Sequence, residues 1–272
     1  MTRIEACIVN HNTSVFTELA LRSLAATHPD WLSDDRLRVT VVDNHSNDEG
    51  LNELRAACGE LDAGFELSRW PLTDASPLPV NSHGDVLRDF VAARPDATHF
   101  LFVDTDTYFL TNDSVGVMLG ELTAESDIWA VQARFAWVED DGGPGASYNL
   151  WSGRVQELRT SIDGAVAGPF PGEHKPRCHP GLALIANTPV FRKVADIIGL
   201  SAGVTMAADE SIAGFADTLG PATVVMATHE LRHVLSAVTV GHYHCVTYPS
   251  DDNPLDWKLD DCHRRLAELR QA

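Results

Sequence analysis

The chain has 272 residues, 44% of them hydrophobic, and a formal net charge of −19 at pH 7. This acidic balance excludes proteins that bind nucleic acid or an anionic membrane surface, because both ligands require a positive footprint. The sequence lacks a signal segment and any apolar run near the roughly 20 residues that cross a bilayer. The five cysteines form no Cys-x-x-Cys pair, so we expect reduced thiols in a soluble, cytoplasmic protein.

Strands and helices alternate along the first half of the chain. The predicted elements are, in chain order, a strand over 4–9, a helix that begins after Thr13 or Ser14, a strand over 39–42, a helix over 51–58, a strand over 65–70, a helix from Asn81 or Ser82 to before Pro95, a strand over 100–103 and a helix over 112–122. Short apolar strands followed by polar residues are typical of a parallel sheet wound with helices. We therefore predict an α/β fold with a mostly parallel central sheet flanked by helices.

The second half of the chain is less regular. Its predicted elements are a strand over 128–138, an acidic turn over 140–145, a Gly/Pro-rich loop over 164–176, an apolar segment over 180–186, helices over 190–198 and 211–219, strands over 222–225 and 238–248, and a helix over 259–269. A long loop between packed elements often closes over a site. No linker is polar or long enough to divide the chain, so we expect one domain over 1–272 with two functional halves that meet near residue 130.

Two carboxylates, Asp104 and Asp106, follow the most apolar strand of the chain. Ligands of open α/β sheets gather outside the carboxyl ends of the strands, so this pair is expected where a ligand binds. Mg²⁺ is usually held by one or two carboxylates together with phosphates of the substrate. The pair therefore predicts a divalent-cation site for a phosphorylated ligand, and the alternative is a solvated loop that happens to contain two acids.

Three strand ends carry polar motifs that occur in a fixed order. The segments Ile-Val-Asn-His-Asn-Thr from residue 8, Val-Val-Asp-Asn-His-Ser-Asn-Asp from residue 41 and Phe-Val-Asp-Thr-Asp from residue 102 resemble the signature of GT-A fold glycosyltransferases, closest to the family-2, rhamnosyltransferase-like group. The match covers roughly residues 4 to 215. The resemblance implies a GT-A fold and a metal-dependent enzyme that moves a sugar from a nucleoside-diphosphate donor to an acceptor hydroxyl, with inversion.

The resemblance also implies donor-binding roles in a nucleotide-sugar-binding half over about 1–130. Asn10 and Asn12 fall in the first motif, beside the nucleoside, and Asp43 accepts a hydrogen bond from an N–H of the base. Asn81 and Gly84 lie in the segment that approaches the diphosphate, where glycine permits close backbone contact. The chain departs from the family pattern here, because two residues separate Asn81 from Gly84.

The implied metal ligands come from both halves of the chain. By resemblance, Asp104 and Asp106 hold Mn²⁺ or Mg²⁺ on the donor diphosphate. Glycosyltransferases of this fold often take a further ligand from a late histidine, and His242 and His244 are the candidates. Side chains at i and i+2 of a strand lie on one face, so both imidazoles can approach one ion. Ordinary histidines without a ligand role are the alternative.

An acidic pair, Asp209 and Glu210, precedes the predicted helix over 211–219 in the acceptor half, about 131–272. Similar proteins carry an acidic pair near this position, one of which acts as general base. A sugar hydroxyl needs such a base, because it is a poor nucleophile until its proton is removed. We favour Asp209, and the alternative is that both acids only stabilise a helix start.

Other functions remain open from the sequence. His229-Glu230-Leu231-Arg232-His233 matches the His-Glu-x-x-His helix motif of zinc proteases, which would make the chain a zinc hydrolase. A non-catalytic relative that binds nucleotide sugars is a second alternative, and a nucleotidyltransferase is a third. The expected partners are a nucleoside-diphosphate sugar and a small-molecule or glycan acceptor, with no nucleic acid and no integral membrane segment.

Overall fold

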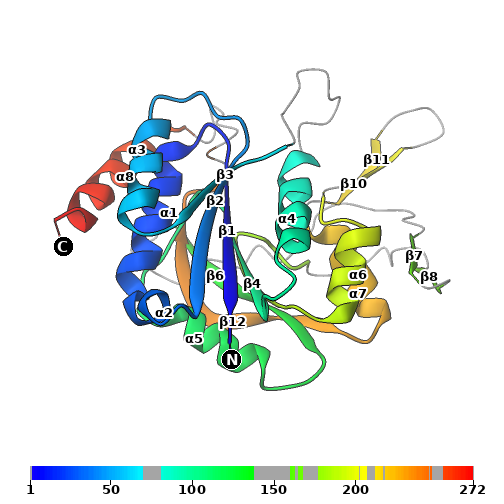
Figure 1. The fold of residues 1–272 in the computed structure, drawn as a ribbon. Coiled ribbons are helices and arrows are strands. Elements are labelled where there is room, and N and C mark those ends of the chain that lie inside the picture. Colours follow the sequence, from blue (N-terminus) through cyan, green and yellow to red (C-terminus); the bar gives the residue numbers. More distant parts are fainter. Residues whose placement is uncertain are drawn as a thin grey trace.

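A mixed sheet of eight strands forms the centre of the structure (Figure 1). The computed structural model describes residues 2–69, 81–137, 160–162, 165–167, 177–201, 203–206, 212–216, 218–244, 246 and 254–271. In spatial order the strands are β3 (Gly64–Leu67), β2 (Leu37–Asp43), β1 (Ile4–Asn10), β4 (His99–Val103), β9 (Leu182–Ala186), β6 (Ile128–Trp137), β12 (Arg232–His242) and β5 (Thr107–Tyr108).

The first four strands of this order are parallel, as the sequence predicts. β9 then runs antiparallel to both of its neighbours, β12 is parallel to β6, and β5 is antiparallel to β12. Two hairpins lie outside the large sheet: β7 (Thr160–Ile162) pairs with β8 (Ala165–Ala167), and β10 (Gly203–Met206) pairs with β11 (Ile212–Ala216). The sheet therefore combines a parallel half with a mixed half.

Helices cover both faces of the sheet (Figure 1). One face packs against α1 (Ser14–Thr27), α2 (Pro29–Ser33), α3 (Leu51–Glu60) and α5 (Ser114–Leu122), and the other packs against α4 (Asn81–Ala93), α6 (Pro189–Ile197) and α7 (Gly220–Thr228). β4 joins the two cores, because Leu101 and Val103 belong to the first cluster while Phe100 and Phe102 belong to the second. This alternation follows from the period of two residues along a strand. The last helix, α8 (Asp256–Leu269), packs on α1.

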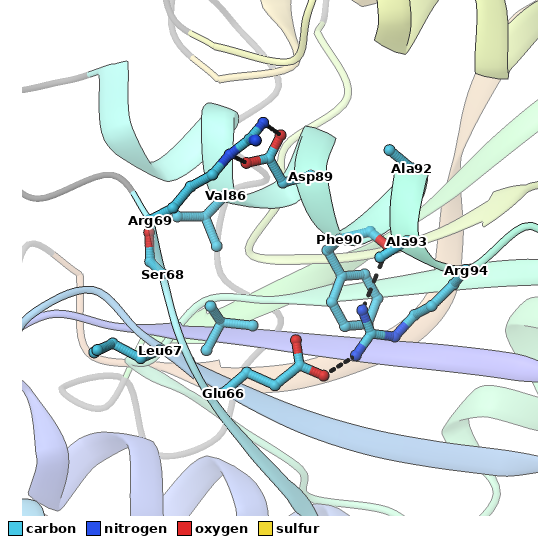
Figure 2. Close-up of a pocket in the computed structure, with 11 residues that line it drawn as sticks. Glu66, Leu67, Ser68, Arg69, Val86, Asp89, Phe90, Ala92, Ala93 and Arg94 are labelled. Atoms are coloured by element: carbon cyan, nitrogen blue, oxygen red, sulfur yellow. Dashed lines mark hydrogen bonds and ion pairs between the residues drawn. The ribbon is translucent and has the colours of Figure 1, made fainter.

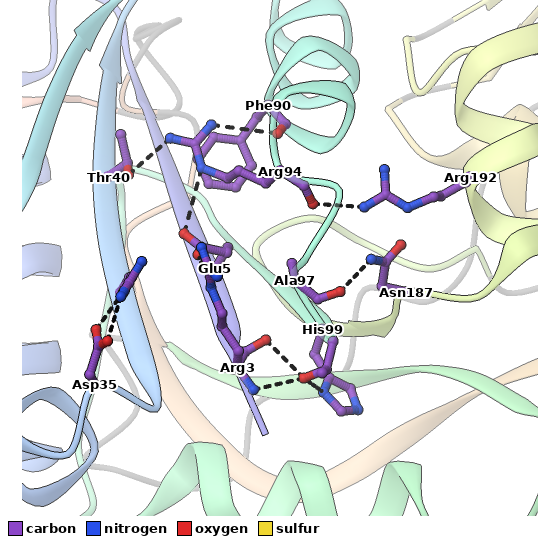
Figure 3. A network of polar contacts seen from close by, with 12 residues as sticks. Arg3, Glu5, Asp35, Thr40, Phe90, Arg94, Ala97, His99, Asn187 and Arg192 are labelled. Atoms are coloured by element: carbon purple, nitrogen blue, oxygen red, sulfur yellow. Dashed lines mark hydrogen bonds and ion pairs between the residues drawn. The ribbon is translucent and has the colours of Figure 1, made fainter. Parts of the chain in front are cut away.

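Arginines fasten the helices to the amino ends of the strands (Figure 3). Arg94, just after α4, places its Nε 3.6 Å from a carboxylate oxygen of Glu5 on β1 and donates from Nη2 to the hydroxyl of Thr40 on β2 at 3.2 Å. Arg192 of α6 donates to the carbonyl of Arg94 at 2.7 Å. These contacts hold the end of α4 and the start of α6 at the edge of the sheet opposite the polar motifs.

Two predicted elements in the second half are wrong. Residues 212–216 form the strand β11 instead of a helix, and residues 222–225 lie in the helix α7 instead of a strand. Val224 and Val225 favour a strand on intrinsic propensity, but Pro221 suits the first turn of a helix and burial of Ala222 and Met226 against the sheet decides the outcome. The strand predicted over 238–248 begins earlier, at Arg232, and ends at His242. The turn over 140–145 lies outside the described residues, and one domain over 1–272 stays a prediction.

Gly84 provides a test of how α4 packs. A Cβ atom at this position would lie 2.2 Å from Cα and 2.4 Å from N of Ser201, which are backbone atoms of the segment that follows α6. Gly84→Ala should therefore lower the free energy of unfolding by about 1–3 kcal/mol, as overpacking does, in urea denaturation.

Gly120→Ala in α5 is the matched control, because a Cβ atom there meets nothing within 4 Å. Alanine in a helix restricts the unfolded chain, so this variant should gain about 0.4–1 kcal/mol. Equal stabilities for the two variants would contradict the close packing of α4 on the Leu200–Ser201 backbone.

Candidate functional site

The motif residues gather at one edge of the sheet. Asn10 is the last residue of β1 and pairs in register with Asp43, the last residue of β2. Asp104 comes directly after β4, the other neighbour of β1. Because the carboxyl ends of parallel strands meet at the same edge, the three motifs form one polar rim.

Asn10 ties the first two strand ends to the start of α1. Its side chain is fully buried, and Nδ2 lies 3.0 Å from Asp43 Oδ1, 2.9 Å from Ser46 Oγ and 3.1 Å from Ser14 Oγ. The hydroxyl of Thr17 donates to Asn10 Oδ1 at 2.8 Å. Leaving such a buried group unpaired costs about 1–3 kcal/mol, so this network gives Asn10 a structural role. Its contact with a donor nucleoside stays a prediction.

The loop after β2 caps α1. Thr13 occupies the N-cap position of α1 but makes no side-chain cap hydrogen bond there. Instead, the carboxylate of Asp48 accepts the Ser14 N–H at 3.0 Å and the Ser14 hydroxyl at 2.8 Å. Asn12 joins the same two loops, since its Oδ1 accepts the N–H of Asn47 at 2.8 Å while its φ of 53° is left-handed. Hydrogen bonds from side chains of each loop therefore hold the other loop in place.

Asp43 is buried, with 1% of its surface exposed, and its oxygens accept hydrogen bonds from Asn10 and from the Ser46 N–H, the latter at 3.3 Å. A carboxylate offers about four acceptor positions, so further lone pairs remain for a base. A cavity of about 490 Å³ opens next to this strand end, between β3 and α4, and Val42, Val86 and Phe90 are among its lining residues (Figure 2). Apolar side chains thus line part of a cavity on the α4 side of the sheet, and the Asp43 side chain is not among its lining residues.

Two ion pairs frame this cavity (Figure 2). Arg69 donates to both oxygens of Asp89, at 2.5 and 2.8 Å, and Arg94 donates to Glu66 at 2.6 Å. Each pair links the segment of β3 to α4 or to the residue after it. Both pairs are partly exposed to solvent, so we assign them to positioning α4 beside β3 and attribute little stability to them.

Three side chains form a candidate metal centre at the same rim. Asp104, Asp106 and His242 each bring one possible ligand atom within 4.8 Å of the other two. In the part of the chain that the structure describes, no other group of three or more His, Cys, Asp or Glu side chains comes as close together. Carboxylate oxygens and an imidazole nitrogen are suitable ligands for Mn²⁺ and related divalent cations.

The pairing of β5 with β12 brings the two ends of this centre together. His242 lies opposite Thr107 in the register, so Asp106 comes beside the end of β12. Gly241 lies opposite Tyr108, and a Cβ atom there would stand 2.0 Å from Tyr108 Cζ. Glycine thus permits the register that places His242 Nε2 at 3.2 Å from Asp106 Oδ1.

His242 is held through Nδ1, and its Nε2 points toward Asp106. Nδ1 accepts the backbone N–H of His244 at 3.0 Å, so the neutral ring carries its proton on Nε2, which faces Asp106. Nε2 is buried and forms no hydrogen bond with any residue in the described ranges. This orphaned nitrogen fits a ligand role, and an ion that binds there must displace the proton.

Two more histidines surround Asp104. His83 on α4 places Nε2 3.6 Å from Asp104 Oδ1, and His179 places Nδ1 3.9 Å from Oδ2. Burial and, second, the nearby Arg177 hold the pKa of His179 well below its ordinary value, so its ring is neutral at pH 7. The sequence motifs do not predict either contact. The available signal was that His83 falls in the first turn of a helix whose start faces the strand ends.

His244 is not among the three side chains whose possible ligand atoms lie within 4.8 Å of one another, and its role as a metal ligand stays a prediction. Its ring centroid lies 6.1 Å from that of His242, and its backbone turns away with a φ of 56°. Of the two late histidines, the structure thus brings His242 to the aspartates. Asn81 begins α4, and its side chain lies outside the described residues. Gly84 faces the backbone of Ser201, which gives a packing reason for this glycine.

Asp209 and Glu210 lie outside the described residues, in the connection between β10 and β11. The sequence predicts a helix after these two acids, but residues 212–216 form the strand β11. The structure therefore does not support the alternative that the acids only stabilise a helix start. Their role as general base stays a prediction.

The structure contradicts the zinc-hydrolase alternative. α7 ends at Thr228, and His229 and Glu230 lie in an exposed turn in which Glu230 has a φ of 60°. His233 then lies on β12. The protease motif requires both histidines on one helix face, and here a turn and a strand boundary separate them.

No family model matches the sequence, and no curated protein sequence gives a significant match. Solved structures do match. A mannosyltransferase from Pyrobaculum calidifontis, in complex with GDP-Man and Mn²⁺, is 18% identical with a TM-score of 0.55, over 94% of this chain and 59% of that one. Residues 1–349 of S. aureus TarS are 15% identical with a TM-score of 0.52, over 89% of this chain and 60% of that one.

These similarities confirm the GT-A fold predicted from the sequence. The chain spans about three fifths of the length of each of these two proteins. The rhamnosyltransferase-like group stays a prediction. Within the described part of the chain, no helix has both the length and the apolar character that a membrane crossing requires.

The metal centre can be tested by removing its histidine. His242→Ala should weaken Mn²⁺ binding in isothermal titration by at least the roughly 10- to 100-fold that loss of an outer-shell partner causes, because it removes a ligand.

His229→Ala is the matched control, since this histidine lies in the exposed turn of the protease-like motif. It should leave Mn²⁺ affinity unchanged. The assignment of His242 is wrong if both alanine variants bind Mn²⁺ as the unsubstituted protein does.

Proposed function

We propose that the protein is a metal-dependent glycosyltransferase that moves a sugar from a nucleoside-diphosphate donor to an acceptor hydroxyl. One observation carries this proposal: Asp104, Asp106 and His242 meet at the strand ends of a GT-A fold. A mannosyltransferase of this fold was crystallised with GDP-Man and Mn²⁺, which supports the same ligand class here.

Asp104, Asp106 and His242 would hold Mn²⁺ or Mg²⁺ against the donor diphosphate. Such an ion, when bound, neutralises negative charge that develops on the departing nucleoside diphosphate. A protein with a net charge of −19 repels a diphosphate unless the field is relieved locally. A cation between the two aspartates provides this relief, and the imidazole favours Mn²⁺ over Mg²⁺.

The donor nucleoside is proposed to lie along the rim formed by Asn10, Asn12 and Asp43. Asp43 would accept the N–H that uracil, thymine and guanine all present, using a lone pair that its internal hydrogen bonds leave available. The diphosphate then passes the start of α4, where Asn81 and Gly84 lie and where His83 contacts Asp104. This path leads from Asp43 to the metal centre along one edge of the sheet.

Asp209 is the proposed general base, with Glu210 as its neighbour and alternative. Removal of the acceptor proton as the hydroxyl attacks allows a single displacement at the anomeric carbon. A single displacement inverts the configuration at that carbon. The acceptor is a small molecule or a glycan with a free hydroxyl.

A non-catalytic nucleotide-sugar-binding protein would use the same rim without a base. The two functions differ in whether donor is consumed. Release of nucleoside diphosphate in the presence of Mn²⁺ supports transfer, whereas a bound donor that stays intact supports the binding protein.

The double variant Asp104→Ala/Asp106→Ala tests the proposal. In the unsubstituted protein, Mn²⁺ together with UDP, GDP or dTDP should raise the melting temperature, because a ligand that binds the folded state stabilises it by mass action. The double variant should lose this shift and the Mn²⁺-dependent consumption of donor. Unchanged shifts and turnover in the double variant would show that these aspartates do not bind the donor complex.

The role of Asp209 has its own test. Asp209→Asn should lower kcat by roughly 10²- to 10⁴-fold, the usual contribution of a general base, with little change in the melting-temperature shift caused by nucleotide and Mn²⁺. Glu210→Gln is the matched control and should retain most activity. A proton NMR spectrum of the first product should show inverted anomeric configuration, and a retained configuration would contradict single displacement.

A further inference from the structure

The C-terminal helix α8 contacts the segment that carries His242. α8 packs against α1 and against the residues that follow β12, where Tyr243 and Cys262 belong to one small core. Its side toward this core includes Lys258, which is only 1% exposed. A buried lysine next to the candidate metal centre requires a physical explanation, because lysine is almost never fully buried without a partner.

Lys258 is linked to His242 through one residue. Its ammonium donates to the carbonyl of His244 at 2.5 Å. The backbone N–H of His244 donates to His242 Nδ1 at 3.0 Å, and His242 Nε2 faces Asp106 at 3.2 Å. α8 therefore holds the carbonyl of the residue whose N–H sets the orientation of the His242 ring.

Tyr243 provides a second link between α8 and the centre. Its hydroxyl donates to Asp261 Oδ2 at 2.7 Å, and its backbone N–H donates to the carbonyl of Asp106 at 2.9 Å. Its ring packs against Phe16 and Tyr108, with centroids 5.3 and 5.2 Å away. The residue between the two late histidines is thus held by α8 on one side and by the Asp106 segment on the other.

Asp261 is itself held in place by charge. Burial alone would raise the pKa of Asp261, but hydrogen bonds from Tyr243, Arg265 and Arg264 outweigh this effect and lower it. The carboxylate therefore stays ionised at neutral pH and remains an acceptor for the Tyr243 hydroxyl.

Packing alone does not explain the ammonium of Lys258. Replacing a buried charged group by an apolar side chain of similar size is often neutral or stabilising, because the charge no longer loses its hydration. The carbonyl that it binds belongs to His244, whose left-handed backbone is a strained conformation for a residue other than glycine. A donor at this carbonyl holds the strained turn in one arrangement.

We propose that Lys258 and Asp261 of α8 are positioning residues that fix the His242–His244 turn against Asp106 and so preorganise the metal centre. This inference rests on the proposed function for its metal, and it extends that function by giving the C-terminal helix a task at the site. Neither side chain touches the donor or the ion in this account, because each acts through the backbone or the ring of a neighbour.

Lys258→Met tests the proposal, since methionine fills similar space without the ammonium. The amide hydrogens of Tyr243 and His244 should exchange with solvent at least several-fold faster, measured without metal. The affinity for Mn²⁺ alone, measured by titration, should fall roughly tenfold, as it does when outer-shell partners are lost. The melting temperature should stay the same or rise.

Tyr243→Phe removes only the hydroxyl that donates a hydrogen bond to Asp261. If Lys258→Met does not fold, this variant tests the proposal in its place. It should show the same two changes to a smaller extent. Arg270→Gln is the matched control, because Arg270 ties the far end of α8 to Glu18 at 2.7 Å. This control should lower the melting temperature and leave Mn²⁺ affinity and both amides unchanged.

The positioning role is wrong if both site variants exchange these amides at the unsubstituted rate, or if Arg270→Gln alters Mn²⁺ affinity as much as they do. Failure of the proposed function has a different signature. In that case the unsubstituted protein does not bind Mn²⁺, while the amide hydrogens still exchange faster in the site variants.

Discussion

The antiparallel pairing of β5 with β12 is the constraint on which the candidate site depends. β5 has two residues, so the register rests on Thr107 opposite His242 and Tyr108 opposite Gly241. A shift by one residue would turn every side chain of the strand to the other face. It would also bring the Tyr108 ring against a side chain, where Gly241 now leaves space. Sequence positions more than 130 residues apart therefore form one centre because a glycine and an aromatic ring fit together.

The rest of the site is built by satisfying buried polar groups. Asn10 and Asp43 are the last residues of neighbouring strands, and both are buried from solvent. Their hydrogen bonds fix the loops that would surround a donor. Such networks are rigid when every member is paired. Around Asp104 the arrangement differs, because the imidazoles of His83 and His179 stand at 3.6 and 3.9 Å, longer than hydrogen bonds. One side of the rim is thus a hydrogen-bonded network, and on the other side two imidazoles face Asp104 from beyond hydrogen-bond distance.

Local patterns predict the first half of the chain well. An apolar strand followed by Asp104 and Asp106 identifies a ligand edge without knowledge of the rest, because strand direction alone places the side chains. The second half depends on contacts distant in sequence. Val224 and Val225 favour a strand and lie in a helix because of burial. His242 and His244 are equivalent at i and i+2, and only the end of β12 at His242 separates them. β5 is too short to show any period, and Lys258 resembles an exposed helix residue until its partner is known.

Pulsed electron paramagnetic resonance of Mn²⁺ bound together with a nucleoside diphosphate tests the central claim most directly. It detects magnetic nuclei near the ion, so the protein and ligand atoms around it are read at once. We expect ³¹P coupling from the diphosphate and ¹⁴N coupling from one histidine, with the nitrogen signal absent in His242→Ala. A nitrogen signal that persists in this variant, or bound Mn²⁺ with no phosphorus coupling, would contradict a metal centre formed by Asp104, Asp106 and His242 for a nucleotide-sugar donor.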